Sequence, residues 1–422
     1  MSILIKDAAI LSMEDERAIF TADLAIIGNK IAMIAQDKGQ QNYQQVIDGR
    51  GLLAMPGLIN THSHAGMSLF RGYGDDLELM VWLSERIWPK EALLTADDIA
   101  KGSLLSMVEM IKSGTTCFAD MYFEMDAVAE AVASVGMRAV LSEGMTGQEE
   151  KLEKFPHFYR RWQGAHDGLI SVMLGPHAPY TCSPDYLREV IALAKEYAAP
   201  IHIHLAETRF EVAQMQELYQ KRPVELMAEL GLFAENKVLA AHGVYIDESE
   251  MELLQGHDVS IAHNPCSNMK LASGIAPIGS FLDKGINVSI GTDSACSNNN
   301  LDMFAELRTA ALLAKVATAD STVLPAGEAL KMATVNGAKA LGYPNLGQLK
   351  EGMLADLILI DLDGPHLQPP TDPVSNLVYA ASGSDVNSVI INGKLVMKKR
   401  ELLTVDEEKI KFAANQVAKR LL

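Results

Sequence analysis

The stretch Met55-Pro56-Gly57-Leu58-Ile59-Asn60-Thr61-His62-Ser63-His64 decides how the rest of the chain is interpreted. An apolar run leads into two histidines separated by one residue, and side chains two positions apart point to the same face of a strand. Two imidazoles directed at one point can begin a metal site, although two histidines hydrogen-bonded to the backbone would give the same pattern. Because no helical apolar stripe follows directly in Ala65-Gly66-Met67, we expect the strand to end here, where parallel α/β folds hold their active sites.

Downstream of this stretch, apolar strand-like segments alternate with segments that carry helix signals. Thr95 is a suitable N-cap for a helix over about 96–113, and Ser183 before Pro184 marks another helix start. After the first strand at 56–64, further strands are predicted at 115–120, 138–142, 169–175, 200–204, 237–242, 258–262 and 287–291. Eight strands over roughly 300 residues, most of them followed by a helix, predict an α/β fold built on a parallel TIM (β/α)8 barrel.

The two ends of the chain carry strand signals instead. Short strands are predicted at 2–5 and 23–34, the second with a hairpin turn at Gly28-Asn29, where both residues tolerate positive φ. After a predicted helix over 328–341, strand patterns return at 347–360 and 387–396. We therefore expect the β segments of both ends to form one domain from residues 1–55 and 355–422, with the barrel over residues 56–354.

Composition and charge limit the classes of function. The chain has 36 Lys and Arg residues against 54 Asp and Glu residues, and its formal net charge of −18 repels nucleic-acid backbones and anionic membrane surfaces. No apolar run approaches the length of about 18 residues that a membrane helix needs, and no leader pattern opens the sequence, so we expect a cytoplasmic protein. The cysteines are too scattered for a disulfide framework or a thiolate metal site; they are Cys117, Cys182, Cys266 and Cys296.

Histidines and acidic residues follow the ends of the predicted strands, which meet at one mouth of a barrel. The residues in these positions are His62, His64, His177, His204, His242 and Asp293. Imidazoles and one carboxylate form a donor set suited to Zn²⁺ or Fe²⁺ with a position left for water. Such a cation lowers the pKa of water to about 7, which indicates hydrolytic chemistry.

Glu207, three residues after His204, is placed to shuttle protons beside the metal, and His242 to align water or polarise an oxyanion. Each has another interpretation, because Glu207 could only favour the start of the following helix and Asp293 could be an Asx-turn residue. His202 shares a face with His204 but lies one layer deeper, so we expect it in the core or supporting a ligand. His263 could bind substrate or order a loop, and we assign it no role.

These motifs together resemble the amidohydrolase superfamily, and within it the methylthioadenosine/S-adenosylhomocysteine deaminase family. The matching segments are 56–64, His202-Ile203-His204-Leu205-Ala206-Glu207-Thr208, Ala241-His242-Gly243, His263-Asn264-Pro265, Gly291-Thr292-Asp293 and 350–357. The resemblance implies a distorted TIM barrel, a β-sandwich formed from both termini, and one divalent metal, Zn²⁺ with Fe²⁺ as the alternative. The ligands that it implies are His62, His64, His204 and Asp293. Binuclear members carry a carboxylated lysine after the fourth strand, where this chain has none.

The resemblance also implies an activity, the hydrolytic deamination of 5′-substituted adenosines to the inosine analogue and ammonia. Asp293 would act as base, His242 would align the water, and Glu207 would protonate the ring. Glu207 and Asp293 would also contact the substrate, together with Glu91, His177 and Trp82. From the residues alone, Trp82 and Trp88 fit the apolar face of a helix equally well.

One departure from the family concerns the 5′ group. Members that bind homocysteine tend to have an arginine after the third strand, where this chain has Glu143, with Lys151 as the nearest downstream cation. Because a glutamate repels a carboxylate, we expect neutral 5′ substituents to be preferred over S-adenosylhomocysteine. The rival functions are a guanine-type deaminase, an s-triazine hydrolase, and a metal-free scaffolding homologue. The expected partner is a small nucleoside, and the family suggests a homo-oligomer.

Overall fold

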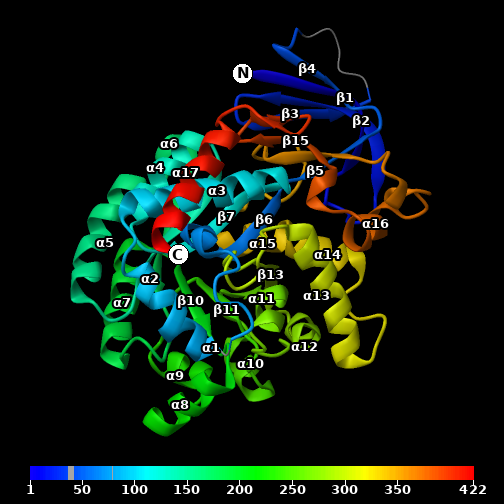
Figure 1. Ribbon diagram of the computed structural model, residues 1–422. Coiled ribbons are helices and arrows are strands. Elements are labelled where there is room, and N and C mark those ends of the chain that lie inside the picture. Colours follow the sequence, from blue (N-terminus) through cyan, green and yellow to red (C-terminus); the bar gives the residue numbers. More distant parts are fainter. Residues whose placement is uncertain (37–41, 78) are drawn as a thin grey trace.

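The computed structural model describes residues 1–36, 42–77 and 79–422, in which helices surround one β-sheet and a second sheet lies to one side (Figure 1). The surrounded sheet has eight parallel strands in the order β13-β12-β11-β10-β9-β8-β7-β6. Its strands are β6 (Leu58–Ser63), β7 (Thr115–Tyr122), β8 (Arg138–Met145), β9 (Ile170–Pro176), β10 (Ile201–Leu205), β11 (Val238–His242), β12 (Val259–His263) and β13 (Asn287–Ile290). The predicted barrel is therefore confirmed, with each predicted strand present.

The seam between β6 and β13 distorts the barrel, because these two strands are not neighbours in the ladder of paired strands. Individual hydrogen bonds close it instead. The Asp293 amide donates to the carbonyl of His62 at 2.9 Å, and the Thr61 hydroxyl donates to the carbonyl of Ile290 at 2.9 Å. This closure brings the end of the last strand directly beside the histidine pair of the first.

Helices follow most strands, and their starts agree with the predicted caps. The Thr95 side chain accepts from the Asp98 amide in a capping box, and Ser183 accepts from the Tyr186 amide. The principal helices around the barrel are α3 (Ala96–Lys112), α4 (Met125–Val135), α5 (Glu149–Trp162), α7 (Pro184–Tyr197), α8 (Arg209–Tyr219), α9 (Pro223–Glu229), α10 (Glu248–Leu254), α11 (Pro265–Lys270), α12 (Ile278–Asp283) and α13 (Met303–Thr318). None of the described helices is long and apolar enough to cross a membrane.

The helix predicted over 328–341 is two helices, α14 (Ala326–Met332) and α15 (Val335–Leu341). Thr334 between them has φ −131° and ψ −91°, which is not helical. The carbonyl of Ala333, which would accept within a continuous helix, instead accepts from the Ile59 amide of β6 at 2.8 Å. A tertiary hydrogen bond therefore competes with the helical one, and the sequence pattern does not show it.

The second sheet confirms that both ends of the chain meet in one β module. It has nine strands in the order β17-β16-β15-β14-β5-β1-β2-β3, with β4 paired to β1. They are β1 (Ser2–Leu11), β2 (Ile19–Ile27), β3 (Lys30–Ala35), β4 (Gln45–Asp48), β5 (Leu52–Pro56), β14 (Leu357–Asp361), β15 (Val386–Ile391), β16 (Lys394–Lys398) and β17 (Glu401–Leu402). Aliphatic side chains from both ends share its core, among them Ile3, Ile5, Leu24, Leu357 and Leu359.

The chain end beyond the sheet lies on the barrel. Helix α17 (Glu407–Leu421) packs beside α3, as the red and cyan helices of Figure 1 show. The ion pair between Lys112 and Glu407 and that between Arg420 and Asp98 both measure 2.6 Å. Residues 355–422 therefore contribute to the second sheet and also pack on the barrel. The domain limits given above stay a prediction.

Candidate active site

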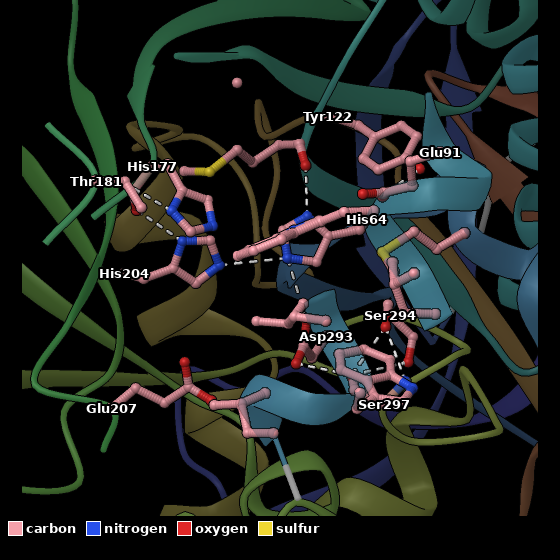
Figure 2. A pocket seen from close by; sticks show the side chains of 18 of the residues that line it. His64, Glu91, Tyr122, His177, Thr181, His204, Glu207, Asp293, Ser294 and Ser297 are labelled. Carbon is pink, nitrogen blue, oxygen red and sulfur yellow. Dashed lines mark hydrogen bonds and ion pairs between the residues drawn. The ribbon is translucent and has the colours of Figure 1, made fainter. Parts of the chain in front are cut away.

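A cavity of about 510 Å³ lies at the C-terminal ends of the barrel strands (Figure 2). Every predicted strand-end residue except His62 lines it: His64 after β6, His177 after β9, His204 on β10, His242 on β11 and Asp293 after β13. Residues of α1 (Leu79–Val81), η2 (Trp82–Ile87) and α2 (Trp88–Glu91) line another part of the cavity.

Four side chains bring their polar atoms together at the base of this cavity. Asp293 Oδ1 lies 3.5 Å from His62 Nε2 and 3.2 Å from His64 Nε2. His204 Nε2 lies 3.3 Å from His64 Nε2. The candidate ligand atoms of the three histidines all lie within 4.8 Å of one another. Residues that are up to 231 positions apart in the chain thus surround one point, which is the geometry that a metal ion needs.

The hydrogen bonds of the imidazoles show that this cluster fits a divalent cation. The Nδ1 atoms of His64 and His204 contact the carbonyls of Met121 and His177. A carbonyl only accepts, so both Nδ1 atoms carry hydrogen and both Nε2 lone pairs face the cluster. His62 Nε2 is buried and has no hydrogen-bond partner among the residues that the structure describes, which is costly unless another group occupies that position. Nitrogen lone pairs and a carboxylate are the donors that Zn²⁺ and Fe²⁺ accept.

Asp293 is oriented by its own hydrogen bonds. Its Oδ2 atom accepts from the Ser267 hydroxyl at 2.6 Å and from the Ser297 hydroxyl at 2.8 Å, which leaves Oδ1 facing the histidines. Burial alone would raise the pKa of Asp293, but the adjacent imidazoles of His62 and His64 outweigh it and hold that pKa well below its usual range. Asp293 is therefore an ionised carboxylate that can hold a cation or accept a proton.

Glu207 and His242 face each other at the side of the cluster. Their closest atoms, Glu207 Oε2 and His242 Nε2, are 3.8 Å apart. Burial raises the pKa of Glu207, with the charge of His242 opposing it, so the protonated acid is favoured more than in water. His242 Nδ1 contacts the amide oxygen of Asn268 at 2.9 Å, which holds the imidazole with Nε2 toward the cavity. The pair has the arrangement of a proton donor beside an oriented imidazole.

The residues expected to contact a nucleoside line the same cavity. Glu91 Oε1 accepts from the Tyr122 hydroxyl at 2.6 Å, and burial raises the pKa of Glu91. Burial lowers the pKa of His177 to about 4, so its imidazole is neutral at pH 7. Trp82 lies in η2 and is 5% exposed, whereas Trp88 is 44% exposed. Trp82, Glu91 and His177 therefore all line the cavity that holds the histidine and aspartate cluster.

Sequence reasoning missed the residues that support this arrangement. Glu211, buried in the first turn of α8, accepts from the amides of Ala206 and Glu207, both at 2.9 Å. Its burial raises the pKa of Glu211 to about 8. A glutamate three residues after a threonine cap was the available signal, and it is also an ordinary capping pattern. Of the serines bound to Asp293, Ser267 lies on α11 and only the fold brings it to this carboxylate, whereas Ser297 follows Asp293 by four residues without a motif that marks it.

The expected effect of Glu143 has no geometric basis. On β8, Ser142 and Gly144 face the barrel interior and Glu143 faces outward, because neighbouring residues of a strand alternate. Glu143 lines a neighbouring cavity of about 420 Å³, where it pairs with Lys151 and accepts from the Met125 amide at 3.1 Å. The repulsion of a substrate carboxylate by Glu143 was therefore a wrong expectation.

Comparison with known proteins agrees with this geometry. The amidohydrolase family matches residues 53–396. A 5-methylthioadenosine/S-adenosylhomocysteine deaminase of Pelotomaculum thermopropionicum is 51% identical, over 100% of this chain and 99% of the relative. A 5′-deoxyadenosine deaminase of Methanosarcina acetivorans is 49% identical, over 100% and 98%.

Solved structures agree as well. The structure of an adenosine deaminase from Xanthomonas campestris with bound zinc superimposes with a TM-score of 0.96 at 34% identity, over 99% of this chain and 98% of that one. The match to the family extends over most of the sequence, and the relatives are matched from end to end. The chain therefore belongs to the amidohydrolase family.

Proposed function

We propose that this chain is a metal-dependent hydrolase that deaminates 5′-substituted adenosines to the inosine analogue and ammonia. The observation that carries this proposal is the convergence of imidazole lone pairs, the ionised Asp293 and the acid Glu207 in one cavity. Relatives near half identity are named as deaminases of such nucleosides, which supports the substrate class.

His62, His64, His204 and Asp293 would hold one divalent cation. Zn²⁺ is the first candidate because a related structure contains it, and Fe²⁺ is the alternative that the donor set also accepts. When bound, such a cation lowers the pKa of water to about 7 and so provides a nucleophile at neutral pH.

The side chains around the cluster would then handle the protons. Asp293, kept ionised by its neighbours, accepts a proton from the water that attacks C6 of the adenine ring. His242 orients this water through Nε2, and Glu207 in its protonated form gives a proton to the ring nitrogen. The proton held by Asp293 then passes to the amino group, which leaves as ammonia, while the new hydroxyl at C6 gives its proton to Glu207; this forms the C6 carbonyl and restores the acid.

The ribose would be recognised by Glu91. One of its oxygens accepts from the Tyr122 hydroxyl, and the other can accept from a sugar hydroxyl. Trp82 offers an apolar ring to the nucleoside, and the neutral His177 offers a hydrogen bond without a charge.

The cavity favours a neutral 5′ group. Among the described residues that line it, none is lysine or arginine. Lys151 lies over the ring of Phe123, which lines the cavity, at 5.2 Å, and is paired with Glu143 outside. We therefore expect methylthioadenosine and 5′-deoxyadenosine to be deaminated faster than S-adenosylhomocysteine, whose carboxylate finds no cation here.

The test is a substrate panel followed by ultraviolet absorbance and ammonia release with Zn²⁺ or Fe²⁺ supplied. It contains methylthioadenosine, 5′-deoxyadenosine, adenosine and S-adenosylhomocysteine, with guanine and an s-triazine as rivals. Ammonia from the nucleosides supports the proposal, and its absence from all of them rejects it. Glu91→Ala should weaken nucleoside turnover and leave a ribose-free substrate unaffected. Metal analysis of the purified protein tests the scaffolding alternative. Cytoplasmic location and oligomeric state remain predictions.

A further inference from the structure

A histidine binds a metal through Nε2 only when its hydrogen lies on Nδ1, so each ligand needs a fixed tautomer. For His64 and His204 the backbone provides it, because their Nδ1 atoms contact the carbonyls of Met121 and His177. These carbonyls accept and never donate. The correct tautomer of these two imidazoles therefore follows from the fold of the main chain.

His62 differs, because its Nδ1 atom contacts a side chain that can either donate or accept. The contact is His202 Nε2, at 2.8 Å. On its other side, His202 Nδ1 lies 3.2 Å from the Ser142 hydroxyl oxygen. The Ser142 hydroxyl donates to the carbonyl of Asp120 at 2.8 Å. The side chains of His62, His202 and Ser142 are completely buried, so water does not replace any of these contacts.

The direction of this chain of hydrogen bonds follows from its last member. Because the Asp120 carbonyl can only accept, the Ser142 hydrogen points to it, and the Ser142 oxygen must accept from His202 Nδ1. His202 Nε2 then carries a lone pair and accepts from His62 Nδ1. His62 Nε2, which is buried and accepts no hydrogen bond within the described part of the chain, is left with its lone pair toward the cluster.

We propose that His202 and Ser142 are positioning residues that set the tautomer and orientation of His62 as a metal ligand. Through these two side chains, the Asp120 carbonyl fixes the tautomer of His62, whereas main-chain carbonyls contact the other two imidazoles directly. This inference rests on the metal site of the proposed function. It gives His202 a role that an ordinary core histidine, with partners in any direction, would not have.

The experiment measures Zn²⁺ affinity of the full-length protein by competition with a chromophoric chelator. His202→Leu removes the acceptor, and we expect affinity to fall about 10–100-fold, the usual cost of losing a group that orients a metal ligand. His202→Gln places an amide oxygen at similar reach and should recover most of the affinity. Ser142→Ala, a milder change that preserves folding, should lower affinity on the order of tenfold.

The matched control is His263→Leu, which removes another buried imidazole that contacts none of the four ligands through a hydrogen bond among the described residues. Its Zn²⁺ affinity should equal that of the wild type. Wild-type affinity in His202→Leu and Ser142→Ala would overturn the inference, as would an equal loss in His263→Leu. A wild-type protein that binds no Zn²⁺ or Fe²⁺ would overturn the proposed function as well, so the two failures are distinguishable.

Discussion

The two ends of the barrel use buried polar groups in opposite ways. At the N-terminal ends of the strands, where the two sheets join, Arg138 Nε contacts Asp356 Oδ2 at 2.7 Å and Nη2 contacts Oδ1 at 3.0 Å. The third nitrogen, Nη1, donates to the carbonyl of Gly168 at 2.8 Å. Both side chains are at most 1% exposed. Every charged atom of this pair has a partner within the protein.

At the C-terminal ends of the strands, hydrogen bonds also hold the buried polar side chains, but the atoms proposed to act in chemistry face a cavity. None of the described residues forms a hydrogen bond with His62 Nε2, and the backbone at the strand ends is left-handed at Ala206 (φ 52°), His242 (φ 75°) and Asp293 (φ 59°). Such conformations are unfavourable for residues other than glycine and collect at functional sites. The comparison indicates that satisfied polarity serves stability at one end, and that unsatisfied, directed polarity serves chemistry at the other.

Removal of the metal should have the largest effect on activity, and it tests the role given to the C-terminal end of the barrel. Extended dialysis against a chelator should abolish deamination while the circular dichroism spectrum remains folded, because the cores of both sheets do not include the cluster. Zn²⁺ or Fe²⁺ should restore the activity. Full turnover by protein shown to be metal-free would contradict the assignment of the rim as a metal centre.

Glu207→Gln should lower kcat by about 10²–10⁴-fold, the usual contribution of a positioned acid or base. Stability should hold or increase, because burial disfavours the ionised form of Glu207. In the wild type, kcat should fall as pH rises through this raised pKa, because the acid form is lost. Kinetics and urea unfolding measured together check this, and a parallel loss of stability would mean that Glu207 is structural.

Arg138→Leu tests the opposite end and should destabilise the protein by about 3–5 kcal/mol, because it leaves the Asp356 carboxylate buried and unpaired. The folded fraction should retain its kcat. Arg161→Leu is the matched control, since its pairs with Asp126 and Glu130 are about half exposed and should contribute at most about 1 kcal/mol. Equal losses in urea unfolding from both variants would remove the distinction between buried and exposed pairs.

Glu211→Gln should have the smallest effect, lowering kcat by roughly 10–100-fold, since glutamine keeps only one of the two oxygens that accept from the Ala206–Glu207 turn. The matched control is Glu250→Gln. Glu250 is equally buried and accepts from the Val224 and Asp247 amides, but lies outside the cavity. The control should lose stability and retain kcat. Similar kcat for both variants would show that Glu211 only supports the fold.

Much of the fold was predictable because strands, caps and turns are local patterns. The eight barrel strands followed from short apolar segments that alternate with helix signals, and the meeting of both chain ends followed from strand and turn signals at each end. The break that divides the predicted helix over 328–341 into α14 and α15 was not predictable. It depends on the Ala333 carbonyl, which accepts from β6 instead of continuing the helix. Glu143 was misjudged because neighbouring residues of a strand face opposite sides, and which side faces the cavity depends on the barrel's register.

The sequence by itself determined which residues stand at the strand ends, since an apolar run followed by a histidine or an aspartate marks such an end locally. It could therefore predict that His62, His64, His204 and Asp293 meet. Only the tertiary structure decided how each polar atom is directed: Ser267 and Ser297 turn one oxygen of Asp293 away, and His202 turns Nε2 of His62 toward the cluster. Ser267 and His202 are distant in the chain from the side chains that they orient, so no local pattern encodes the direction of these hydrogen bonds.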